Sequence, residues 1–236
     1  MTTKFFERPR SGERAVLVHA SPDGLPDESE REEFAELARD LAQQLFVKKV
    51  PVALNQEVTA ELIKSELPDA VILATGAREV TPPIPGIDLP HVVQAWDVLQ
   101  GKAATGRRVV VIGGGAVGVE VALLLAEQGT LSGEELKFLL LNGAESLEDL
   151  QRLATQGTKK ITLIELQDKL GTNFGKSTRW SMLQDMSRYS VDIRLQTKVV
   201  RIEEKSVVIE AGAQQEHIKA DTVLLAVGTR PQNSLA

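Results

Sequence analysis

The sequence contains no cysteine, and this absence excludes several kinds of chemistry. Without a thiol the chain has no disulfide framework, thiolate nucleophile or cysteine-ligated zinc, and it holds no iron–sulfur cluster of its own. Histidine is also scarce. His19, His91 and His217 lie far apart, without the spacing of metal ligands, so we expect them at surfaces or in turns. The sequence therefore gives no indication of metal chemistry.

Long apolar runs and positive net charge are missing as well. No run approaches the roughly 20 residues that a membrane-spanning helix needs, and residues 1–8 are too polar for a signal peptide. The net charge of −6 has no basic stripe to offset it, which argues against nucleic acid as a partner. We expect a soluble, cytoplasmic protein of one large domain or two small ones.

The most informative segment is residues 107–120, where an apolar, β-branched run ends on glycines and continues as a helical pattern. In such a turn Gly113 permits the tight bend, Gly115 lets a pyrophosphate approach the backbone, and Gly118 lets helix and strand pack closely. The helix N-terminus then offers free N–H groups to phosphate. The candidate cofactor-binding residues here are Gly113, Gly114, Gly115, Ala116, Val117 and Gly118. The alternative is a tight turn without a ligand.

The second half of the chain reads as a Rossmann-like α/β unit. Strands are predicted at 108–113, 160–166, 191–195 and 222–227, helices at 116–128 and 176–189, and an antiparallel meander at 198–219. Alternating strands and helices imply right-handed crossovers and a parallel sheet.

A helical hairpin is predicted as an insertion over residues 130–158. The acidic strand end, Glu165, follows Gly118 by 47 residues instead of about 20. Two helix start signals and two glycine stops account for the extra length: Ser132 with Glu135, Gly143, Ser146 with Asp149, and Gly157. Because the insertion follows the C-terminal end of the first helix, it should lie away from the dinucleotide. We expect it to be a packing or oligomer surface.

The first hundred residues are harder to interpret. A helix is predicted at 30–45 and strands at 49–54 and 70–77. The proline-rich segment 81–86 excludes helix and central strand, so it marks a domain boundary, with residues 1–85 and 86–236 as the two domains.

Together these segments resemble the two-dinucleotide-binding-domain flavoprotein oxidoreductases. The nearest resemblance is to the reductase portion of the old-yellow-enzyme-like group, which includes 2,4-dienoyl-CoA reductase and trimethylamine dehydrogenase. The matching stretches are 54–59, 68–77, 95–102, the glycine turn and 221–233, and they cover most of 27–236 in the family's order. The resemblance implies one domain for FAD, one for NAD(P)H, and hydride transfer from nicotinamide to flavin.

The chain also departs from this pattern. It has one glycine fingerprint, and Phe5 to Glu7 looks like the second strand of an FAD unit whose first strand, glycine loop and helix are absent. The family continues beyond residues 231–233, whereas the sequence ends at Ala236. We therefore expect residues 1–85 to be an incomplete FAD-domain remnant, and the chain alone to bind FAD weakly and to be inactive. Alternatively, a partner chain supplies the missing FAD segments.

Three further residues are candidates for the nucleotide site. Glu165 would accept hydrogen bonds from the adenosine ribose and repel a 2′-phosphate, which favours NADH; the alternative is an exposed strand-end acid. Glu120 either complements the helix dipole or, by resemblance, reaches toward the nicotinamide. Gly228, after the last strand, should lie beside the nicotinamide or its ribose.

Two aromatic residues and one arginine are given structural roles. Arg179 and Trp180 would suit a phosphate clamp and a stacking platform, but a solvated arginine and a half-buried tryptophan are favoured; Trp96 is expected in the core. No acid, base or nucleophile constellation is found, which suits a class in which cofactors carry the chemistry. The sequence thus predicts the NAD(H)-binding domain of an FAD-dependent NADH oxidoreductase. The alternative is a non-catalytic interaction module that docks through the hairpin and keeps the fold as a scaffold.

Overall fold

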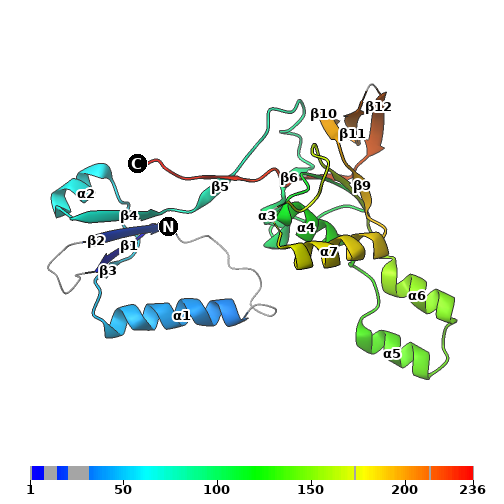
Figure 1. Cartoon of the computed structure of the whole chain (residues 1–236), viewed down its shortest axis with the longest axis horizontal. Coiled ribbons are helices and arrows are strands. Elements are labelled where there is room, and N and C mark those ends of the chain that lie inside the picture. Colours follow the sequence, from blue (N-terminus) through cyan, green and yellow to red (C-terminus); the bar gives the residue numbers. More distant parts are fainter. Residues whose placement is uncertain (1, 8–14, 21–31, 173, 213, 236) are drawn as a thin grey trace. The chain divides into compact units, whose positions relative to one another are not determined.

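The computed structural model describes residues 2–7, 15–20, 32–172, 174–212 and 214–235, and Figure 1 shows its helices and strands. The chain forms two compact units. Glu79–Gly228 make up one, and the residues up to Arg78 together with those from Thr229 onward make up the other. The sequence places the boundary at residues 85 and 86, a few residues later, and does not indicate that the C-terminal residues return to the first unit.

The larger unit is built on a five-stranded sheet in the order β6-β13-β7-β8-β9, with every neighbouring pair parallel. The strands are β6 (Val92–Gln94), β7 (Arg108–Ile112), β8 (Lys160–Ile164), β9 (Asp192–Arg194) and β13 (Thr222–Leu225). Helices α3 (Ala95–Leu99), α4 (Ala116–Ala126) and α7 (Lys176–Arg188) complete the crossovers. The predicted Rossmann-like parallel sheet is confirmed, with strand and helix ends within two residues of the predicted ones.

Both faces of the sheet are buried, which explains the continuous apolar run of β7. Val109 and Val111 belong to the core shared with α4, whereas Val110 and Ile112 belong to a second core. The second core includes side chains of the predicted antiparallel meander, now β10 (Thr197–Glu203), β11 (Ser206–Ala211) and β12 (Gln214–Lys219). Burying each of these large side chains stabilises the fold by about 1.5–3 kcal/mol.

The inserted hairpin consists of α5 (Gly133–Leu141) and α6 (Leu147–Thr155), drawn as two neighbouring helices in Figure 1. At its start Ser132 Oγ accepts from the Glu135 N–H at 3.2 Å, and Glu135 Oε2 accepts from the Ser132 N–H at 2.8 Å. This is the predicted capping box, and it is confirmed. The second start signal is confirmed too, because Ser146 Oγ accepts from the Asp149 N–H at 3.1 Å.

The smaller unit contains a four-stranded sheet in the order β3-β1-β2-β4. Its elements are β1 (Thr2–Glu7), β2 (Ala15–Ala20), α1 (Glu32–Val47), β3 (Val52–Ala53), α2 (Ala60–Glu66) and β4 (Ala70–Ala74). Strand β1 runs antiparallel to both of its neighbours. The second strand of a parallel dinucleotide unit pairs parallel, so the interpretation of residues 5–7 as that strand is wrong. A separate pair, β5 (Ala77–Glu79) and β14 (Thr229–Pro231), forms a two-stranded sheet.

Candidate dinucleotide-binding site

Two glycines of the turn between β7 and α4 are required by the fold itself. Gly113 has φ +108°, and a Cβ there would lie 2.4 Å from the Ala226 carbonyl oxygen. A Cβ on Gly118 would lie 1.9 Å from the Gly113 carbonyl oxygen. Real Cβ atoms do not come so close to backbone, so these glycines permit the tight bend and the close helix–strand packing that the pattern predicts.

Gly115 is different, because a Cβ built on it would meet no atom within 4 Å. It is the N-cap of α4, in extended backbone conformation. The first N–H groups of a helix have no acceptor within the helix, so Ala116 and Val117 present donors at the same place. Open space beside unpaired backbone donors and the positive end of a helix dipole suits an anion such as a pyrophosphate.

The structure brings Glu165 to the glycine turn in spite of the 47-residue separation. Its Oε2 accepts from the Gly114 N–H at 2.6 Å, and its Oε1 accepts from the Gln167 N–H at 2.8 Å. β8 pairs with β7 in parallel, so the carboxyl ends of both strands meet at one sheet edge. The insertion leaves this arrangement intact because it lies between α4 and β8.

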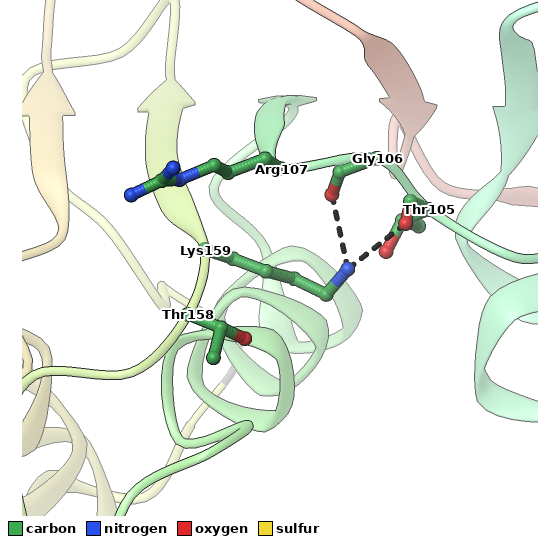
Figure 2. A pocket seen from close by; sticks show the side chains of 5 residues that line it. All are labelled: Thr105, Gly106, Arg107, Thr158 and Lys159. Atoms are coloured by element: carbon green, nitrogen blue, oxygen red, sulfur yellow. Dashed lines mark hydrogen bonds between the residues drawn. The ribbon is translucent and has the colours of Figure 1, made fainter.

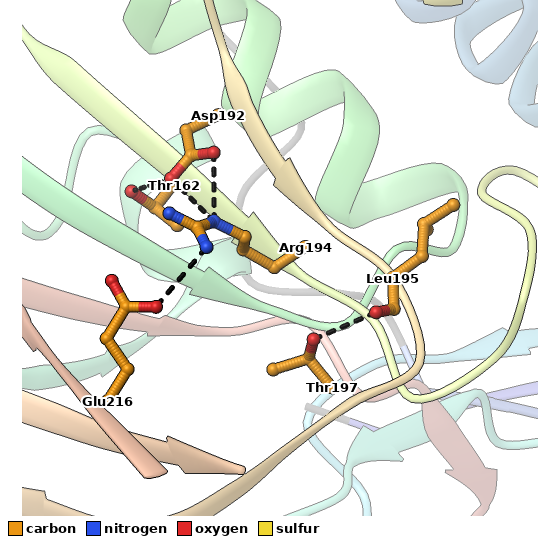
Figure 3. Close-up of polar contacts among 6 residues, drawn as sticks. All are labelled: Thr162, Asp192, Arg194, Leu195, Thr197 and Glu216. Atoms are coloured by element: carbon orange, nitrogen blue, oxygen red, sulfur yellow. Dashed lines mark hydrogen bonds and ion pairs between the residues drawn. The ribbon is translucent and has the colours of Figure 1, made fainter. Parts of the chain in front are cut away.

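The backbone of Glu165 is held from the outer side as well. Its N–H donates to the Arg194 carbonyl oxygen at 2.8 Å, and its own carbonyl accepts from the Thr197 N–H at 3.0 Å. Figure 3 shows the neighbouring polar contacts: Arg194 bonds Asp192 and Glu216, and the Thr197 hydroxyl donates to the Leu195 carbonyl at 2.8 Å. Charged groups at this edge strand also discourage pairing with another chain.

A further set of contacts, which the sequence analysis missed, reaches the turn from the segment after β8. The Gly171 N–H donates to the Gly114 carbonyl oxygen at 2.7 Å, and a Cβ on Gly114 would meet the Leu170 side chain. Leu170 is only 2% exposed. The signal available in the sequence was a single leucine before a glycine in an otherwise polar segment.

Arg179 and the two tryptophans differ from expectation. Arg179 is half-buried rather than solvated, and its Nε donates to the Leu170 carbonyl oxygen at 2.7 Å. Trp180 is 68% exposed rather than half-buried, and Trp96 is 39% exposed rather than in the core. Amphipathic helix patterns identify a buried face only when the face has a partner, and these two side chains have little covering them.

The remaining candidates lie at the same edge or near it. Glu120 is the fifth residue of α4, beyond the first turn, so the helix-dipole role that the sequence suggested is not favoured. Gly228 has φ +97°, and its carbonyl accepts from the Val80 N–H at 3.0 Å. It follows β13, which pairs parallel with β7, so it lies at the carboxyl edge of the sheet with the glycine turn.

A surface pocket occurs at the opposite edge of the sheet, where β7 and β8 begin. Figure 2 shows the residues that line it: Thr105, Gly106, Arg107, Thr158 and Lys159. Lys159 Nζ donates to the carbonyl oxygens of Thr105 and Gly106 at 2.9 and 3.0 Å. The ammonium group is thus used to tie the two strand starts together.

Within the described residues, no group of three or more histidine, aspartate or glutamate side chains could hold a metal ion. No helix in the same part of the chain has the length and apolar character needed to cross a membrane.

A parallel sheet with a glycine turn, an open helix N-terminus and an acidic neighbouring strand end is the arrangement typical of dinucleotide-binding α/β units. The amino-acid sequence also matches a known protein family. The family model described as pyridine nucleotide-disulphide oxidoreductase matches residues 10–236, and the chain belongs to that family of flavin- and nicotinamide-dependent oxidoreductases.

Several curated proteins are similar in sequence. A metal reductase of Desulforamulus reducens is 42% identical over 99% of the chain, a bilirubin reductase of Mediterraneibacter gnavus 32% over 85%, and an NADH oxidase of Thermoanaerobacter brockii 33% over 81%. The chain covers 34%, 27% and 26% of their respective lengths, so it spans about a third or less of each.

A solved structure supports the fold. A 2-naphthoyl-CoA reductase aligns with a TM-score of 0.64 at 23% identity, over 93% of this chain and 30% of that one. The likeness shows the same α/β architecture.

Proposed function

We propose that this chain binds NAD(H) at the glycine turn and presents its nicotinamide for hydride transfer to a flavin. The observation that carries the proposal is the open position of Gly115 at the N-terminus of α4, with the Glu165 carboxylate held beside the turn by the Gly114 N–H. The nicotinamide, when bound, supplies the hydride, and the chain supplies binding and orientation.

Each residue of the site has a distinct task in this proposal. The N–H groups at Gly115, Ala116 and Val117 bind the pyrophosphate. A carboxylate has about four acceptor positions, and backbone N–H groups use two of those on Glu165. The other two are left for the adenosine ribose hydroxyls. The negative charge also disfavours a 2′-phosphate, so NADH should bind more tightly than NADPH.

We also propose that the chain is related to one particular group within this family. The matching segments resemble the reductase portion of old-yellow-enzyme-like NADH:flavin oxidoreductases, and the relatives named as bilirubin reductase and NADH oxidase are compatible with such a parent. FAD is implied by the family, and we expect the activity in the cytoplasm. The absorbance of the purified chain near 450 nm would report bound flavin. A colourless preparation agrees with weak FAD binding by this chain alone, whereas a yellow one would contradict it and support a partner chain that supplies the missing FAD segments.

Isothermal titration calorimetry with NADH and NADPH tests the main proposal. We expect saturable NADH binding, weaker NADPH binding, and loss of both in Gly115→Val, because valine fills the open position. Gly133→Val is the matched control, since a Cβ at Gly133 in α5 also meets no atom within 4 Å. Absence of NADH binding by the wild-type chain would refute the proposal.

One observation favours the alternative, a non-catalytic interaction module. The hairpin exposes large apolar side chains, with Phe138 at 65% and Leu141 at 74%, and such surfaces often mark contacts between proteins. In this alternative the surface joins two copies of the chain. Light scattering would show a dimer that Phe138→Glu with Leu141→Glu dissociates, whereas a monomeric wild-type chain would refute the self-association.

A further inference from the structure

We propose that Arg179 is a positioning residue for the pyrophosphate-binding turn, acting through two peptide groups in series. This inference rests on the proposed NAD(H) site and names the device that orients it. Arg179 is the fourth residue of α7, and it does not belong to the glycine turn. It reaches the turn through the backbone of the segment after β8.

The first peptide group is the one between Leu170 and Gly171. Arg179 Nε donates to its carbonyl oxygen at 2.7 Å, and its N–H donates to the Gly114 carbonyl oxygen at 2.7 Å. A peptide group is planar and rigid. Fixing its oxygen therefore also fixes the direction in which its N–H points.

The second peptide group is the one between Gly114 and Gly115. Its carbonyl accepts from Gly171, and its N–H is that of Gly115, at the N-cap of α4. Hydrogen bonds in series polarise one another, and a charged donor strengthens the chain. The guanidinium thus both orients the Gly115 N–H and makes it a stronger donor toward an anion.

Other contacts make this path a defined one. The Gly114 N–H is held separately by the Glu165 carboxylate at 2.6 Å, so both peptide groups that include Gly114 are fixed. Leu170 lies 2% exposed in the core shared with α4, which keeps its carbonyl in place. Arginine suits this task because its charge is permanent and its planar group holds one geometry.

The test compares three variants of the full chain. Arg179→Met keeps the apolar stem and removes the donor, so NADH should bind about tenfold more weakly, the lower end of the effect of one lost charged hydrogen bond. Arg179→Lys retains a cationic donor and should restore most of the affinity. Arg188→Met is the control on the last turn of the same helix, where the arginine pairs with Asp185, and it should bind NADH normally.

Amide hydrogen exchange of the ligand-free protein separates this inference from the proposed function. We expect faster exchange of the Gly171 amide, which donates to the Gly114 carbonyl, in Arg179→Met and near-native exchange in Arg179→Lys. Unchanged exchange, or an unchanged NADH affinity in Arg179→Met, would overturn the positioning role. If the wild-type chain does not bind NADH at all, the proposed function fails, and the exchange rates alone decide the role of Arg179.

Discussion

Gly118→Ala should destabilise the larger unit although alanine is the better helix former. In α4 the exchange gains about 1 kcal/mol of helix propensity. The added Cβ, however, would lie 1.9 Å from the Gly113 carbonyl oxygen, and this neighbour is backbone held in the tight turn. The added atom can be accommodated only if the helix and the strand end move apart.

The expected size follows from these two opposing terms. Overpacking a well-packed site costs roughly 1–3 kcal/mol and occasionally more, and displacing backbone places this site at the upper end. We expect a net loss of about 2 kcal/mol after the propensity gain. For a unit of this size that corresponds to a decrease in melting temperature of about 4–8 °C.

Thermal unfolding followed by circular dichroism measures the effect. Gly115→Ala is the matched control in the same turn, because its Cβ meets no atom within 4 Å, and its melting temperature should stay near that of the wild type. An equal or higher melting temperature for Gly118→Ala would refute the assignment of Gly118 to close packing. Loss of stability in Gly115→Ala would refute the assignment of Gly115 to ligand approach.

Three other predictions follow from the same structure. The Arg108 side chain hydrogen-bonds the Asp221 carboxylate and lowers its pKa from 3.8 to about 2, so this stabilisation is present above pH 3.8 and is lost as the pH falls through about 2. In Asp221→Asn the urea midpoint should be lower at neutral pH, and it should change less than that of the wild type as the pH falls from 3.8 to about 2. Ser132→Ala removes the cap of α5 and should cost about 1 kcal/mol, seen as faster amide exchange confined to the hairpin; unchanged exchange would contradict the cap. Glu165→Gln removes the charge that repels a 2′-phosphate, so the preference for NADH over NADPH should fall at least about fivefold in calorimetric titrations, and an unchanged preference would contradict that role.

The features that the sequence predicted well are those encoded by neighbouring residues. The β-branched run 109–112 and the glycines after it determine a strand, a turn and a helix start within a few residues. The helix caps at Ser132 and Ser146 are equally local, since side chain and backbone partner lie three residues apart. In these cases short-range sterics and hydrogen bonding leave one conformation.

The features that sequence reasoning missed depend on contacts between distant segments. Nothing near Arg179 in the sequence indicates that its partner is the Leu170 carbonyl, because that meeting requires both α7 and the segment after β8 to be in place. The antiparallel pairing of β1 likewise depends on its neighbours in the sheet and not on its own residues. Trp96 shows the converse, because an apolar residue in a helix can remain exposed when no element covers it.

The closure at the base of the hairpin has a consequence for chain length. The Leu131 N–H donates to the Leu153 carbonyl in α6 at 3.1 Å, and the Thr158 N–H donates to the Gln128 carbonyl at 2.8 Å, so hydrogen bonds join the beginning and the end of the insertion. The insertion connects to the rest of the unit at this hydrogen-bonded base. The entropic cost of closing a loop grows only logarithmically with its length, so a longer insertion costs little additional stability. A reporter domain could therefore be inserted into the hairpin while the sheet edge that carries the glycine turn keeps its geometry.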